Sequence, residues 1–132
     1  MTKLEQIQQW TAEHHASMTY LSNPKTIQYL TGFGSDPIER VLALVIFPDQ
    51  DPFIFAPALE VEVIKETGWK FPGGGYLDHE NPWAMIADQV KQRHVNPEHI
   101  ALEKGQLQVA RMEALAAQFT SPRFDLDITT FI

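Results

Sequence analysis

The fold is decided by the stretch NPKTIQYLTGFGSD (residues 23–36) and by the apolar run RVLALVIF (residues 40–47) that follows it. Asn23 is a favoured helix N-cap, and Pro24 fits the first helical position, where no backbone donor is needed. Gly32 can adopt the left-handed conformation that ends a helix. We therefore predict a short capped helix that begins at Pro24 and ends at Gly32.

Two patterns indicate that this helix packs against a buried strand. Ile27, Leu30 and Phe33 lie three residues apart, so they form one apolar stripe, which Tyr29 flanks. Seven of the eight residues 40–47 are apolar, and they are rich in Val, Leu and Ile. Such a run is typical of a central strand that is covered on both faces.

Strands and helices alternate along the rest of the chain. We predict helices at residues 2–15, 57–68, 82–94 and 106–119 from their caps and apolar spacing. We predict strands at residues 18–21, 53–56, 69–71, 100–102 and 124–128. The turn at residues 48–52 predicts an antiparallel hairpin between the strands on either side of it, so the sheet is mixed. The expected fold is therefore α/β, with a mixed sheet of about five or six strands flanked by helices.

Composition narrows the classes of partner. The 132 residues include 17 acidic and 10 basic side chains, which give a formal net charge of -7. No cluster of Lys and Arg is present that could bind a phosphate backbone or an anionic membrane. The chain has no cysteine, which excludes disulfides and thiolate metal sites. With no recognisable signal peptide or membrane span, we expect a cytoplasmic domain that binds neither nucleic acid nor membrane.

The segment NPKTIQYLTGF (residues 23–33) resembles the segment near the start of Xaa-Pro dipeptidases (prolidases) and of the wider creatinase and aminopeptidase P group. Its sharp motif is YLTGF, at residues 29–33. Further segments are similar to strands of the same N-terminal domain, at residues 18–21, 53–57 and 124–128. The resemblance implies that residues 1–132 form a creatinase/prolidase-type N-terminal domain with a ribonuclease H-like topology.

The resemblance also implies a function for the whole protein. Family members hydrolyse dipeptides with a C-terminal proline, by chemistry that resembles two-metal catalysis with divalent ions such as Mn, Co or Zn. The ligands for these ions belong to a C-terminal "pita-bread" catalytic domain, whose metal-ligand motifs match no position here. We therefore expect no catalytic residue, no metal site and no cofactor in this chain. Because it stops at Ile132, where the family continues into a linker, we expect an excised domain.

Two hypotheses of different class follow. In the first, the chain is the non-catalytic N-terminal domain of an Xaa-Pro dipeptidase, and it contributes dimer contacts and an active-site loop in trans. Its partners are then a second subunit, its own C-terminal catalytic domain and a proline-containing dipeptide. In the alternative, it is a free-standing α/β binding or regulatory module with the same fold and no peptidase partner. A downstream region with two Asp, one His and two Glu ligands would distinguish them.

The loop between the capped helix and the long strand is the candidate substrate-contacting segment. The resemblance implies that this loop, residues 34–40 here, reaches over the active site of the partner subunit. A dipeptide that ends in proline carries one carboxylate and one amine. Arg40 could bind the carboxylate through two parallel hydrogen bonds, and Asp36 could accept from the amine. The alternative is that Asp36 caps the turn and Arg40 is a solvated strand end.

Other clusters of polar or glycine residues are expected to be structural. The glycine triplet at residues 73–75 lacks the spacing of a phosphate-binding loop and is predicted to be a flexible surface loop. Asp78, His79 and Glu80 alternate in direction along an extended chain, so they are not expected to converge on a metal. The strand at residues 41–47 and the one before it contain no acid, which argues against nuclease chemistry. Four histidines at predicted element ends are expected to be solvated or capping: His14, His15, His94 and His99.

Overall fold

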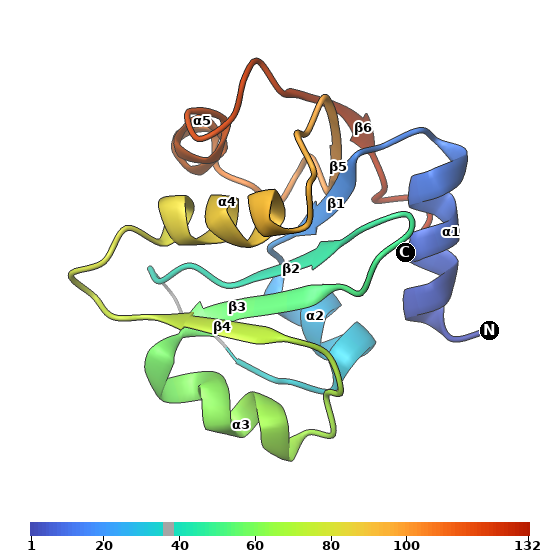
Figure 1. The fold of residues 1–132 in the computed structure, drawn as a ribbon. Coiled ribbons are helices and arrows are strands. Elements are labelled where there is room, and N and C mark those ends of the chain that lie inside the picture. The colour runs from blue at the N-terminus through green and yellow to red at the C-terminus, as the bar shows by residue number, and fades with distance from the viewer. Residues whose placement is uncertain (36–38) are drawn as a thin grey trace.

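The computed structural model describes residues 1–35 and 39–132, and it contains a six-stranded sheet with helices on both faces (Figure 1). The strands are β1 (Met18–Leu21), β2 (Ala43–Ile46), β3 (Phe53–Pro57), β4 (Gly73–Tyr76), β5 (His99–Leu102) and β6 (Arg123–Asp127). The helices are α1 (Lys3–Glu13), α2 (Pro24–Thr31), α3 (Val61–Glu66), α4 (Pro82–Gln92), α5 (Val109–Ala116) and the 3-10 helix η1 (Ala58–Glu60). No helix in the described part of the chain is long and apolar enough to cross a bilayer.

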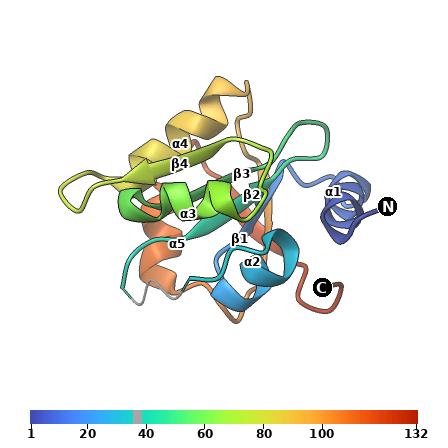
Figure 2. The same cartoon turned by 90° about the horizontal axis from the view of Figure 1, so that it is seen from below.

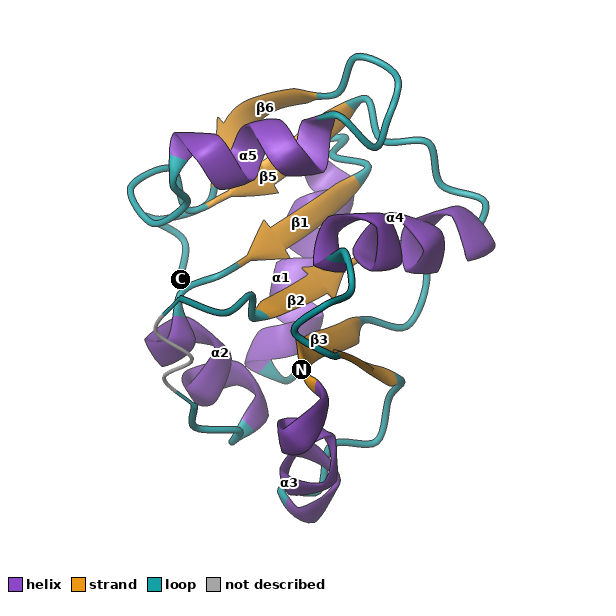
Figure 3. Ribbon diagram, turned by 90° about the vertical axis from the view of Figure 1, so that its left-hand side faces the viewer, coloured by secondary structure: helices purple, strands orange, loops and turns teal. Residues whose placement is uncertain are grey.

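The sheet is mixed, with the strand order β4-β3-β2-β1-β5-β6 (Figure 3). β1, β2 and β3 are antiparallel neighbours, and the predicted hairpin pairs Ala43 with Phe55 and Val45 with Phe53. The other three pairs, β3–β4, β1–β5 and β5–β6, are parallel. The predicted α/β class and mixed sheet are confirmed, and the series β3-β2-β1-β5-β6 agrees with a ribonuclease H-like topology.

Helix α2 forms as its caps predict. The side chain of Asn23 accepts a hydrogen bond from the backbone N–H of Lys25 at 3.1 Å, and Pro24 occupies the first turn. Gly32 has a φ of +80°, and its N–H donates to the carbonyl of Gln28 at 2.8 Å. A side chain at that φ would be strained, so glycine ends the helix here.

The predicted apolar stripe of α2 is buried at its two ends. Ile27 and Phe33 are buried in the core, and Leu30 packs partly against it. Tyr29, however, is 66% exposed, so it does not flank the buried stripe as expected. Phe33 follows the helix in sequence, and its burial fixes the start of the next segment to the core.

Each face of the sheet buries its own apolar core. Helices α4 and α5 cover one face, where Tyr20, Val45 and Phe55 contribute to the core. Helices α1, α2 and α3 cover the other face, where Leu44 and Ile54 contribute. Figure 3 shows α4 and α5 in front of the sheet and α1 behind it. Successive residues of β2 alternate between the two cores, so β2 is the central strand, covered on both faces, that its composition predicts.

The prediction of a strand at residues 69–71 is wrong, because the fourth strand is β4 and includes the glycine triplet. β4 pairs in parallel with β3, from Ile54 opposite Gly73 to Pro57 opposite Tyr76. A Cβ at Gly75 would lie 2.6 Å from Cγ2 of Val61 and 3.0 Å from Cα of Ala58. The bare backbone therefore lets η1 and α3 pack directly on this strand, and the triplet is not the surface loop that its composition predicts.

Several predicted elements are shorter in the structure. The strand predicted over residues 40–47 becomes β2, which begins at Ala43, because the N–H of Val41 donates to the hydroxyl of Tyr76 and not to a neighbouring strand. The helix predicted over residues 57–68 is divided into η1 and α3. The helix predicted over residues 106–119 is shorter, and only the residues of α5, Val109–Ala116, are helical.

The C-terminal residues lie beside α1 (Figures 1 and 2). Nζ of Lys3 donates to the carbonyl oxygen of Phe131 at 3.1 Å and lies 4.5 Å from the centroid of its ring. The rings of Trp10 and Phe131 are also near neighbours, with centroids 6.2 Å apart. The first helix and the last residues of the chain are therefore fixed to each other.

Candidate functional site

Arg40, one of the two predicted site residues, lies at the surface just before β2. Its Nη2 is 2.9 Å from Oδ2 of Asp78, and the two side chains are 48% and 71% exposed. An ion pair between groups this exposed contributes roughly 0–1 kcal/mol. Arg40 can therefore exchange Asp78 for another anion at low cost. The second predicted residue, Asp36, lies outside the described residues.

The backbone on both sides of Arg40 is held by side chains from distant elements. Nη2 of Arg111, on α5, donates to the carbonyl oxygen of Glu39 at 2.6 Å, and Nη1 donates to that of Arg40 at 3.5 Å. The N–H of Val41 donates to the hydroxyl oxygen of Tyr76 at 2.5 Å. Three consecutive residues are thus held through their backbone, while the guanidinium of Arg40 stays at the surface.

Tyr76 is suited to this contact because its ring is buried. It is 6% exposed, and it stacks on Phe55 with centroids 5.3 Å apart and an interplanar angle of 4°. Burial raises the pKa of the Tyr76 phenol above its ordinary value, although the hydrogen bond from Val41 opposes the shift. The phenol therefore stays neutral, and its oxygen serves as an acceptor for the backbone.

The segment that leads from α2 toward the loop is also fixed. The N–H of Phe33 donates to Oγ1 of Thr31 at 3.0 Å. The hydroxyl of Ser35 donates to Oε1 of Glu60, in η1, at 2.6 Å. Side-chain contacts therefore hold the chain at Ser35 and again at Glu39, on the two sides of residues 36–38.

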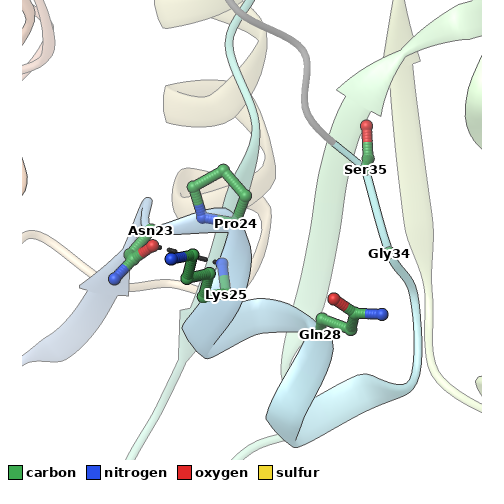
Figure 4. Close-up of a pocket in the computed structure, with 6 residues that line it drawn as sticks. All are labelled: Asn23, Pro24, Lys25, Gln28, Gly34 and Ser35. Carbon is green, nitrogen blue, oxygen red and sulfur yellow. Dashed lines mark hydrogen bonds between the residues drawn. The ribbon is translucent and has the colours of Figure 1, made fainter.

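A surface hollow of about 550 Å³ lies between α2 and this segment (Figure 4). It is lined by Asn23, Pro24, Lys25, Gln28, Gly34 and Ser35. Gln28 lies over Gly34, because a Cβ built there would be 2.7 Å from Nε2 of Gln28. The described residues of the lining offer amides, a hydroxyl and an ammonium group, and none of these six is a carboxylate or an imidazole. They can form polar contacts, and they include no acid–base pair.

A buried carboxyl group lies next to α2 on its other side. Glu103, which follows β5, is 7% exposed, and Oγ1 of Thr26 donates to its Oε2 at 3.2 Å. Its Oε1 has no hydrogen-bond partner among the residues that the structure describes. Burial raises the pKa of Glu103, and the hydrogen bond from Thr26 opposes the shift. This contact joins the first turn of α2 to the end of β5.

The residues that the structure describes form no site for the two divalent ions that the family resemblance implies. Within residues 1–35 and 39–132, no group of three His, Cys, Asp or Glu side chains could hold a metal ion. Of the acids weighed as ligands, Asp78 pairs with Arg40, and Oε1 of Glu80 accepts from the N–H of Leu77 at 2.7 Å. No metal-dependent step is therefore assigned to these residues.

Sequence reasoning singled out Arg40 but missed the three side chains that hold it and its neighbours. Asp78 lies 38 residues further along the chain, and Arg111 lies 71 residues further along. Tyr76 comes directly after the glycine triplet, in a segment that the sequence predicts to be a loop. No local pattern marks contacts over such separations, so no signal in the sequence could have identified them.

Comparison with known sequences gives a consistent result. The chain matches the family model of the Creatinase/Prolidase N-terminal domain over residues 3–129. It is 43% identical over 129 residues to the Xaa-Pro dipeptidase of Lactobacillus helveticus, a match that covers 98% of this chain and 35% of that protein. The Xaa-Pro dipeptidase of Lactobacillus delbrueckii subsp. lactis gives the same values. The chain thus spans 35% of the length of these curated relatives.

Solved structures agree with the fold. The N-terminal domain of Xaa-Pro dipeptidase from Lactobacillus brevis is 91% identical, has a TM-score of 0.96, and matches over 98% of this chain and 97% of that chain. A proline dipeptidase structure from Streptococcus pneumoniae is 37% identical, with a TM-score of 0.92, and matches over 99% and 94%. Because those chains are hardly longer than this one, a unit of this length folds without further residues.

Proposed function

Because the chain belongs to the creatinase/prolidase N-terminal domain family, we propose that it is the non-catalytic N-terminal domain of a metal-dependent Xaa-Pro dipeptidase. The longer protein hydrolyses dipeptides with a C-terminal proline. This domain contributes contacts to a homodimer, and its loop before β2 reaches the active site of the second subunit. The match to 35% of the length of Xaa-Pro dipeptidases supports this hypothesis over a free-standing module.

The observation that carries the role of the loop is the exposed guanidinium of Arg40 on a fixed backbone. A guanidinium presents its N–H donors in a planar fork that matches a carboxylate, and the substrate carries a free carboxylate on its proline. Asp78 already accepts one hydrogen bond from this guanidinium, from Nη2 to Oδ2 at 2.9 Å. The substrate carboxylate would take the place of Asp78, and Asp36 would accept from the amine of the dipeptide.

Hydrolysis in this proposal belongs to the C-terminal domain. Two divalent ions such as Mn, Co or Zn, held there, would supply the Lewis-acid chemistry. The part of this chain is to bind one end of the dipeptide and to orient it. We place the protein in the cytoplasm, with which the absence of cysteine is compatible.

The proposal is tested by kinetics of the full-length protein that contains this domain. Arg40→Ala should lower kcat/KM about tenfold or more, mainly through KM, since one charged hydrogen bond contributes about 1.5–3 kcal/mol. The matched control is Arg123→Ala, which removes an exposed arginine from the edge strand β6. The midpoint of thermal unfolding should move by no more than about two degrees in either variant. Unchanged kinetics in both Arg40→Ala and Asp36→Ala would reduce the loop to scaffold.

The proposed homodimer has a separate test. Sedimentation of the full-length protein should show a dimer, and the isolated domain should associate weakly, because an interface that lacks the catalytic domains is small. A full-length protein that stays monomeric at high concentration would contradict a loop that acts in trans.

A further inference from the structure

The three residues before β2 are held in two different ways. Their backbone is held by Arg111 and Tyr76, which bind Glu39, Arg40 and Val41 through carbonyl and amide groups. The side chain of Arg40, in contrast, is held by an exposed ion pair that exchanges easily. The structure therefore separates a fixed backbone from an exchangeable side chain.

Arg111 is well placed to fix this backbone. Arg111 lies on α5, and Leu115 of the same helix is fully buried in the core that α4 and α5 cover. The backbone of Arg111 is therefore rigidly supported. Its guanidinium spans two consecutive carbonyl oxygens, those of Glu39 and Arg40, with two separate nitrogens. Hydrogen bonds from a charged donor are stronger than neutral ones, and the planar fork sets their direction.

We propose that Arg111 is a positioning residue for Arg40. By holding the two carbonyls, it fixes the point and the direction from which the Arg40 side chain leaves the chain. Tyr76 fixes the next residue, so the segment cannot rotate as a unit. This inference rests on the proposed function, because positioning matters for kinetics only if Arg40 binds the substrate.

Loss of the contact between Arg111 and the two carbonyl oxygens should weaken substrate binding. A displacement of about 1 Å in a group that binds the substrate can change rates by orders of magnitude, so loss of the Arg111 contact should reduce the benefit of Arg40. In the full-length protein, Arg111→Ala should raise KM about three- to tenfold and leave kcat nearly unchanged. Arg111→Lys, which can reach one carbonyl with a single ammonium group, should have an intermediate KM.

A double-mutant cycle separates positioning from a general structural effect. If Arg111 acts through Arg40, Arg111→Ala should add nothing further to KM in an Arg40→Ala background. Arg123→Ala is the control for loss of an exposed arginine, and its KM should match that of the parent protein. If Arg111→Ala raised KM by the same factor in the parent protein and in the Arg40→Ala variant, the inference would be overturned.

A second measurement needs no catalysis. In the isolated domain, amide hydrogen exchange at Val41 should become about fivefold faster or more in Arg111→Ala, and should not change in Arg123→Ala, because only the former releases the backbone beside it. Unchanged exchange at Val41 in Arg111→Ala overturns the inference, whatever the kinetics show.

A raised KM in Arg40→Ala with an unchanged KM in Arg111→Ala also overturns the inference and leaves the proposed function standing. An unchanged KM in Arg40→Ala overturns the proposed binding of the substrate by Arg40 and this inference together.

Discussion

Nδ1 of His99 lies 2.7 Å from Oδ2 of Asp125, so a side-chain contact joins the edge strand β6 to its parallel neighbour β5. The contact lies where the register between these strands shifts, between His99 and Ala101. It therefore links the strands at the point where their backbone ladder is irregular.

This pair predicts a loss of stability in acid. The hydrogen bond to His99 holds the pKa of Asp125 below its ordinary value, so the contribution of the carboxylate is present above the ordinary pKa and is lost as the pH falls through the lowered one. Asp125→Asn should destabilise the domain at pH 6 and have little effect well below about pH 4. Denaturant unfolding at the two pH values measures this, with Asp88→Asn on α4 as the control. The same destabilisation by Asp125→Asn at both pH values would contradict it.

The packing of η1 and α3 on β4 predicts different outcomes for two glycines. Gly75→Ala places a Cβ within 2.6 Å of Val61 and 3.0 Å of the backbone of Ala58, so it should destabilise the domain by about 1–3 kcal/mol. A Cβ at Gly105 meets no atom within 4 Å, so Gly105→Ala should be neutral or slightly stabilising. Thermal and denaturant unfolding of the two variants measure their stability relative to the parent domain. Equal stability would mean that β4 is not packed as described.

The buried carboxyl of Glu103 predicts the opposite pH dependence to that of Asp125. Burial raises its pKa in the folded state, so folding becomes less favourable as the pH rises from the ordinary Glu value, about 4.3, through the raised one. Glu103→Gln should therefore become more stable relative to the parent between pH 4 and pH 7. Unfolding free energies across this range provide the measurement. A constant difference between the two proteins would show that Glu103 ionises as readily in the folded chain as in the unfolded one.

The isolated domain should not hydrolyse peptides. No group of acids and histidines that could hold a metal is present among its described residues, so addition of Mn, Co or Zn ions with an Xaa-Pro dipeptide should release no proline. The assay is proline release, with the full-length protein as the positive control. Turnover that a chelator abolishes and added metal restores would show that a catalytic site was overlooked.

The sequence predicts those parts of the fold that depend on local chemistry. The caps of α2 form as expected, because Asn23, Pro24 and Gly32 act within a few residues of themselves. The central position of β2 follows from its continuous apolar run. The strand formed by the glycine triplet could not be predicted from local sequence. It depends on pairing with β3 and on contact with η1 and α3, which are tertiary interactions.

In the candidate site, too, the sequence predicts one part and the tertiary structure is needed for the other. Arg40 could be proposed from the family resemblance and from the carboxylate of a dipeptide. Its actual neighbours, Asp78 and Arg111, come from elements that the fold brings together, and Asp36 lies outside the described residues. Local sequence therefore suggests which group binds, and only the tertiary structure shows what holds it.

The central place of β1 also has a consequence for synthesis on the ribosome. β1 pairs on one side with β2, which follows it closely, but on the other side with β5, in the register of Met18 with Ile100 and Tyr20 with Leu102. All four residues of β1 are buried in the finished sheet. At about 5–20 residues per second, one edge of this apolar strand stays unpaired for on the order of ten seconds before β5 has been made. During that interval the β1–β2–β3 meander offers a free edge, so this stage of biogenesis, more than the completed domain, is where a chaperone would bind or nascent chains would aggregate.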